Sequence, residues 1–184
     1  DHYWGKEMSE TRSITYNLYG IKEPINTLSC IVAIVYVLYN YEKNKILKNL
    51  IILNLVFAII AHSTYNDIAI KLDGLSLALP ILAICYYYKW YKELFVLCLF
   101  FLFCLKIERE GLVMIVGLII IFYNKKNDII NKNNFKKGCI LCIISFILRL
   151  LDEAYPDYWW FYLHSVWHIL MTIGLVMIID SIKW

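Results

Sequence analysis

This 184-residue sequence has little net charge, no internal repeat and no apolar segment near its first residues. The formal net charge is only +3, and the Lys residues lie in short clusters, so nothing indicates a nucleic-acid-binding protein. The chain shows no internal repeat. Its first 20 residues are polar and aromatic without an apolar run, so we expect no cleavable signal peptide.

Cysteine is present, but paired cysteine motifs are nearly absent. All six cysteines lie inside apolar runs, where a thiol is most simply a small hydrophobe. Cys139-x-x-Cys142 has the spacing of a metal or redox motif, but it lacks a second pair and a nearby His. We therefore predict that the cysteines serve in packing. They are Cys30, Cys85, Cys98, Cys104, Cys139 and Cys142.

Apolar residues, in contrast, are in excess. They make up 61% of the chain, and the mean hydropathy is +0.60. Soluble domains contain about 45–50% apolar residues. A soluble protein of this length could not bury so much apolar surface, so lipid must solvate the remainder. We therefore expect residues 1–184 to form a single domain within a membrane.

Short polar segments divide the chain into seven apolar runs, which predict an all-α membrane protein built as a bundle of seven transmembrane helices. Several runs are shorter than the roughly 20 residues that a span requires, and flanking Lys and Tyr side chains can extend them. The charged stretch 106–110 would be costly at mid-membrane, so we predict a surface turn there. The runs are 25–41, 46–61, 68–88, 94–105, 112–123, 139–151 and 159–179.

The distribution of Lys and Arg predicts the orientation of the chain. With seven spans, one face carries eleven Lys residues and the opposite face carries six Lys and Arg residues. The richer face should be cytoplasmic, and it includes the Lys- and Asn-rich loop 124–137. Residues 1–24 would then be a lumenal or extracellular segment, and the helices of residues 25–182 would lead to a cytoplasmic C-terminus. In a eukaryote we expect the endomembranes of the ER or Golgi.

An ionisable side chain in a membrane span costs about 2.5–3.5 kcal/mol on insertion scales, so each one needs a reason, and four of them attract attention. His62 directly follows the second run and Asp73 lies early in the third. His164 and His168 lie early in the seventh. The directions of these spans place all four side chains in the outer half of the bilayer, at one level.

The spacing of His164 and His168 stacks two imidazoles on one helix face, about 6 Å apart along the axis. With His62 from another helix, they supply the three-nitrogen set of a catalytic zinc that keeps one open position. Imidazole also suits iron and copper. Zinc lowers the pKa of its bound water to about 7, and Asp73 is placed to accept a proton from that water or to support a ligand His. The alternative is that these His side chains only join helices by hydrogen bonds.

The order of these residues resembles that of the alkaline ceramidase family. This family belongs to a superfamily of seven-helix membrane hydrolases that includes the adiponectin-type receptors and enzymes that remodel GPI lipids. The similarity extends over essentially the whole chain, and the N-terminal motifs resemble the ceramidases rather than the receptors. The motifs are Tyr3-Trp4-Gly5, the segment 22–29 (KEPINTLS), His62 followed by Lys71-Leu72-Asp73, Arg149-Leu150-Leu151-Asp152 and the segment 163–170 (LHSVWHIL).

This resemblance implies an intramembrane zinc held by His62, His164 and His168, with Asp73 beside the metal-bound water. It implies an amidase that hydrolyses ceramide, or a similar N-acyl lipid of the membrane, to sphingosine and a fatty acid. Two alternatives stay open. One is a slow or non-catalytic lipid-binding or receptor-like relative that keeps the zinc, and the other is a related lipid ester hydrolase.

Ala58 departs from the family pattern. The family usually has Ser four residues before the first His, where its hydroxyl reaches the metal-bound water or the developing oxyanion. Ala58 cannot donate a hydrogen bond, and the loss of one such donor typically costs about 10²–10³ in rate. Ser63 follows His62 directly but points roughly 100° away on a regular helix, so it is a weak candidate to support the site.

The N-terminal segment also departs from the family. Ceramidases carry there an acidic, Asn-containing cluster beside a Trp-Cys pair, and this cluster binds calcium. The present chain has Ser9-Glu10-Thr11-Arg12 instead, and no Cys for the disulfide of some relatives. Glu10 and Glu23 are the remaining candidate calcium ligands, although Arg12 would repel a cation.

Arg149 in the sixth run and Asp152 directly after it complete the prediction. Asp152 is level with the site and is a weak candidate to orient a ligand His. Arg149 is expected to pair with Asp152 or Glu153, or to extend outward to the membrane surface.

Overall fold

A computed structural model describes residues 21, 23–64, 66–106, 111–125, 127–154 and 162–183. In this part of the chain the regular structure is helical, and an isolated bridge pairs Ile129 with Ile182. The all-α prediction is therefore confirmed for the described residues. The helices are α2 (Pro24–Asn40), α3 (Lys45–Thr64), α4 (Asp67–Leu77), α5 (Leu79–Tyr87), α6 (Tyr91–Lys106), α7 (Gly111–Lys125), α8 (Lys132–Ala154) and α9 (Tyr162–Asp180).

The helices α4 and α5 follow each other with a break only at Ala78, so together they form one continuous apolar helical segment. Among the described residues, three helical segments are long and apolar enough to cross a membrane: Lys45–Thr64, Asp67–Tyr87 and Leu163–Asp180. The apolar helices α2 and Leu112–Lys125 are shorter. These findings are consistent with a membrane protein, whereas a bundle of seven spans stays a prediction.

One predicted boundary is wrong. The Lys- and Asn-rich segment 124–137 was expected to be a loop, but α8 already begins at Lys132. The carbonyl oxygen of the Asn131 side chain accepts a hydrogen bond from the backbone N–H of Asn134 at 3.0 Å, which caps the helix start. Lys is also a good helix former, so a polar composition does not prevent a helix. The predicted turn at 106–110 has its residues 107–110 outside the described part.

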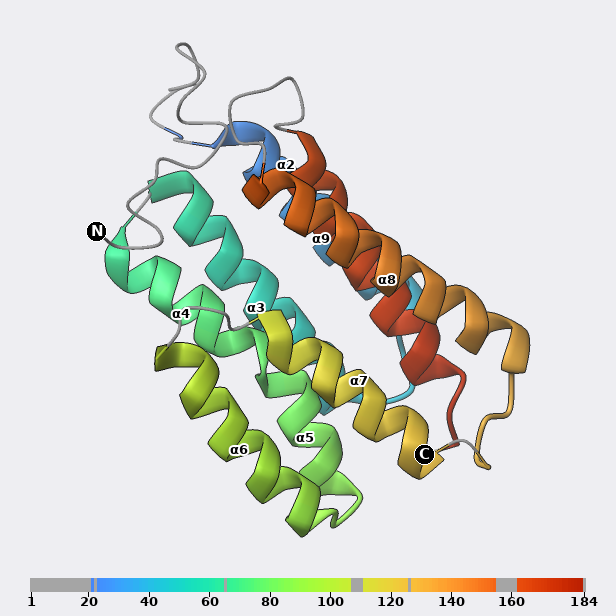
Figure 1. Cartoon of the computed structure of the whole chain (residues 1–184). Helices are drawn as coiled ribbons and strands as arrows, with labels where there is room; N and C mark the ends of the chain where they lie inside the picture. Colours follow the sequence, from blue (N-terminus) through green and yellow to red (C-terminus); the bar gives the residue numbers. More distant parts are fainter. Residues whose placement is uncertain are drawn as a thin grey trace.

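Helices α8 and α9 lie side by side, and α2 packs against both α3 and α9 (Figure 1). Glycine permits the close contact between α8 and α9, because a Cβ added at Gly174 would lie 2.8 Å from the carbonyl oxygen of Gly138. Small residues allow such close approach of helices in membranes. The same packing of α8 on α9 brings the end of α8 beside the start of α9, where His164 and His168 lie.

The buried face of α2 carries residues at helical spacing, from Asn26 through Cys30 and Ala33 to Val37. Its opposite face exposes large apolar side chains, as do the outer faces of α6 and α8. Apolar side chains on the outside of a helical protein are what lipid would solvate. The polar residues instead gather where α2 and α9 begin and α3 ends.

Candidate metal centre

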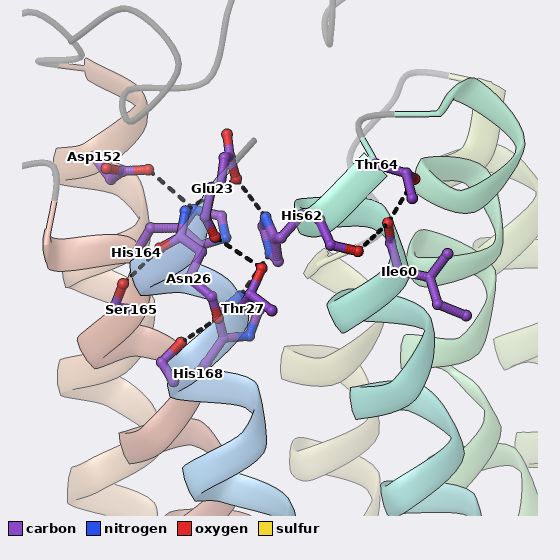
Figure 2. Close-up of polar contacts among 12 residues, drawn as sticks. Glu23, Asn26, Thr27, Ile60, His62, Thr64, Asp152, His164, Ser165 and His168 are labelled. Carbon is purple, nitrogen blue, oxygen red and sulfur yellow. Dashed lines mark hydrogen bonds and ion pairs between the residues drawn. The ribbon is translucent and has the colours of Figure 1, made fainter. Parts of the chain in front are cut away.

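The structure brings together the three histidines that the sequence singled out. His62 lies near the end of α3, and His164 and His168 lie in the first turns of α9. The ring centroids are 5.0 Å apart for His62 and His164, 5.1 Å for His62 and His168, and 4.8 Å for His164 and His168. All three side chains are buried. Figure 2 shows His62 projecting from α3 toward α2 and α9.

His62 is held in an orientation that suits a metal ligand. Its Nδ1 lies 2.5 Å from Oε2 of Glu23, and its Nε2 lies 3.0 Å from Nε2 of His168. An ionised carboxylate only accepts hydrogen bonds, so Nδ1 of His62 donates to it, and in the neutral ring Nε2 then keeps its lone pair. A carboxylate that accepts from the far nitrogen of a ligand His is the usual support of such ligands.

Glu23 itself is anchored by several contacts. Its Oε2 also accepts a hydrogen bond from the Asn26 amide at 3.1 Å, and Asn26 Oδ1 accepts one from the Ser165 hydroxyl at 2.6 Å. The backbone N–H of Glu23 donates to the carbonyl oxygen of His62 at 2.9 Å. These bonds join α2, α3 and α9 around the histidines, as the dashed lines in Figure 2 show.

Cys30 was expected to serve in packing, and it does lie in the buried apolar core. It is fully buried, but its Sγ also belongs to a group with His62 and His168 in which the potential ligand atoms all lie within 4.8 Å of one another. A signal for it existed in the sequence. Glu23, Asn26 and Cys30 are spaced by three and four residues, so they share one face of α2.

His164 has two competing partners on α8. Its Nδ1 lies 2.7 Å from an Arg149 nitrogen and 3.2 Å from Oδ2 of Asp152. The predicted pair of Arg149 with Asp152 is confirmed, at 3.2 Å. Arg149 only donates, so its bond needs a bare Nδ1 on His164, whereas a bond to Asp152 needs a hydrogen there. In the neutral ring, Nε2 is free to bind a metal only in the second case, so Asp152 and Arg149 have opposite effects on His164.

Asp73 lies in α4 and is partly buried, and its negative charge acts on both Cys30 and His62. Its carboxylate is therefore near enough to act electrostatically on the cluster formed by His62, His164, His168 and Cys30. Asn54, on the helix of His62, donates to the Ser76 hydroxyl at 2.8 Å, and that hydroxyl donates to the backbone carbonyl of Asp73. These bonds tie α3 to the segment that carries Asp73.

Other predicted residues lie apart from the cluster or outside the described part. The Ser63 hydroxyl donates to the Ile60 carbonyl of its own helix, so the structure does not bring it to the histidines. Glu10 falls outside the described residues. Glu23 is fully buried, and no described residue is a hydrogen-bond partner of its Oε1. The calcium site of Glu10 and Glu23 stays a prediction.

The donor atoms fit a metal ion of the zinc type. Tetrahedral zinc with bonds of about 2.0–2.1 Å to nitrogen places two nitrogens about 3.3 Å apart. The 3.0 Å between the Nε2 atoms of His62 and His168 is close to that separation. Buried nitrogen and sulfur ligands exclude a site designed for calcium or magnesium, which prefer oxygen. A buried group of Cys30, His62 and His168 can thus hold a metal ion, and its identity as zinc stays a prediction.

The Glu23–His62 bond generates a test. Glu23→Gln keeps the size of the side chain but removes the carboxylate that fixes the tautomer of His62. We expect zinc affinity to fall about 10–100-fold, as measured by competition with a chromophoric chelator. Glu42→Gln, at an exposed position, is the matched control and should bind as the native chain does. Equal affinities in both variants would contradict the role given to Glu23.

Comparisons with known proteins do not add an assignment. No family model matches the chain, and neither the curated proteins nor the solved structures match it.

Proposed function

We propose that this chain is a zinc-dependent intramembrane hydrolase that cleaves the amide bond of ceramide or a similar N-acyl lipid. The observation that carries the proposal is the mutual approach of three buried imidazoles, with ring centroids 4.8–5.1 Å apart, from two helices long and apolar enough to span a membrane. The sequence resemblance to alkaline ceramidases supplies the substrate class.

Polar groups in lipid are expensive and need a reason to be retained. Helix association alone would be satisfied by one hydrogen-bonded pair. Here three imidazoles, a thiol and a carboxylate that holds His62 meet in one buried place. A metal ion accounts for this set better than helix association does, because it bonds to several of these atoms at once.

Each residue has a distinct part in the proposed reaction. His62, His164 and His168 would bind zinc, which supplies a polarised amide carbonyl and a hydroxide at neutral pH. Glu23 and Asp152 would orient His62 and His164 through their Nδ1 atoms. Asp73 would accept the proton of the attacking water as general base.

A substrate that stays in the bilayer must reach the cluster from the side. Ile60 on α3 and Val166 on α9 are large apolar residues within two positions of site histidines, and both are exposed on the outer surface. Two positions correspond to about 200° around a helix, so these side chains mark the outer sides of α3 and α9, opposite the cluster, which lipid would cover. A cluster between helices with such apolar outer sides supports a lipid rather than a water-soluble substrate.

Ala58 favours a second candidate function, a slow or non-catalytic lipid-binding relative. It is buried one helical turn before His62 on α3 and has no hydroxyl to stabilise an oxyanion. Asn54, a further turn away, is already engaged with Ser76. No side chain of this stretch of α3 therefore supplies the donor expected at Ala58.

Hydrolysis should depend on the ion and on the histidines. Purified protein in lipid nanodiscs, given labelled ceramides, should release fatty acid, and chelation or His168→Ala should reduce release to background. Thr64→Ala is the control, because its hydroxyl is exposed and bonds only to its own helix in the described structure. Release that survives both treatments would refute the metal mechanism. Faster cleavage of matched acyl esters than of amides would favour the ester hydrolase.

Restoring the missing hydroxyl tests the second candidate. Ala58→Ser should raise the rate by up to about 10²–10³ if the native chain lacks only that donor. Ala61→Ser is the matched control, since Ala61 is equally buried on the same helix but points about 100° away from His62. Rapid turnover by the native chain would contradict the non-catalytic alternative. An unchanged rate in Ala58→Ser, with zinc retained, would show that a hydroxyl at this position does not act on the reaction.

A further inference from the structure

Cys30 is a buried thiol of the apolar core that also lies near two of the site histidines. It lies seven residues, about two turns, after Glu23 on the same face of α2, and it is fully buried. Glu23 is bonded to His62, so the start of α2 is fixed against the end of α3. This contact holds the Cys30 sulfur near the histidines.

The distances around Cys30 are near those of a coordination sphere. A tetrahedral zinc with bonds of about 2.3 Å to sulfur and 2.0–2.1 Å to nitrogen separates the sulfur from each nitrogen by about 3.6 Å. The Cys30 Sγ and the ligand nitrogens of His62 and His168 all lie within 4.8 Å of one another. An adjustment of about an ångström, within reach of side-chain rotation, would complete the sphere.

His164 is not part of that group, but its ring is near enough to supply the remaining ligand of such a sphere. Its ring lies 4.8 Å from that of His168 and 5.0 Å from that of His62. Three imidazoles and one thiolate make four ligands, the number found in zinc sites that have no open position. A catalytic zinc instead keeps three protein ligands and leaves the fourth position to water.

We propose that Cys30 is a sulfur ligand of the metal and closes the site, so that hydrolysis requires Cys30 to leave the ion. This inference rests on the proposed function, because it concerns regulation of the same centre. When the sulfur binds, the S–H bond breaks, the proton goes to solvent and one sulfur–metal bond forms. In the open form a water takes that position and Cys30 regains a proton. The rate of the native chain is then scaled by the fraction of molecules in the open form.

Cobalt provides a readout that does not depend on activity. Purified full-length protein, freed of metal and loaded with Co²⁺, should show a near-ultraviolet sulfur-to-cobalt charge-transfer band. Cys30→Ala and Cys30→Ser should lose the band yet bind one equivalent of Co²⁺ through the histidines. Cys142→Ala is the matched control, because Cys142 is equally apolar and buried but lies on α8 against Gly174, and it should keep the band.

With zinc and ceramide, Cys30→Ala should exceed the native rate by the inverse of the open fraction. A native protein without the charge-transfer band, or a band that persists in both Cys30 variants, would overturn the inference and leave the proposed function intact. Failure of all variants to bind Co²⁺ would contradict both. A band that depends on Cys30, with no hydrolysis in any variant, would support the sulfur ligand and contradict the hydrolase.

Discussion

The hydrogen bond between Glu23 and His62 is the contact on which the buried cluster depends. A carboxylate and an imidazole, both almost without exposure, lie 2.5 Å apart where α2 begins and α3 ends. Removing one partner of such a pair typically costs about 3–5 kcal/mol, because the other is left buried and uncompensated. The bond also fixes the tautomer of His62 and the position of α2. Cys30, Asn26 and, through Asn26, Ser165 are placed by the same helix.

The two sides of the cluster are built differently. On the side of α2, the contacts to His62 all favour a bare Nε2. On the side of α8, Arg149 and Asp152 compete for the same nitrogen of His164, and only Asp152 leaves the ring ready to bind a metal. The packing of α8 against α9 brings both Arg149 and Asp152 beside His164. His164 would thus be the more adjustable of the proposed ligands. Binding of an ion would favour the form of His164 whose Nδ1 donates to Asp152 over the form bonded to Arg149.

The sequence predicted the all-α class, because apolar runs mark helices, and it singled out His62, His164 and His168, which the structure brings together. It did not predict the start of α8 at Lys132, since an Asn cap and Lys propensity operate without an apolar signal. Cys30 was assigned to packing because a thiol in an apolar run has the composition of a packed residue. Its spacing from Glu23 and Asn26 places it on their face of α2, but its nearness to His62 and His168 on α3 and α9 needs the tertiary arrangement. The contact of Glu23 with His62 was not predicted either, since it joins residues 39 positions apart in the sequence.

X-ray absorption at the zinc edge of the purified protein tests the central claim most directly, because it reports both the presence of an ion and the atoms bound to it. If the histidines and Cys30 bind zinc, we expect about one zinc per chain, with nitrogen ligands at about 2.0–2.1 Å and one sulfur at about 2.3 Å. The signal should disappear when His62 and His168 are both replaced by Ala. A folded and active preparation without metal, or zinc bound only to oxygen, would contradict the account.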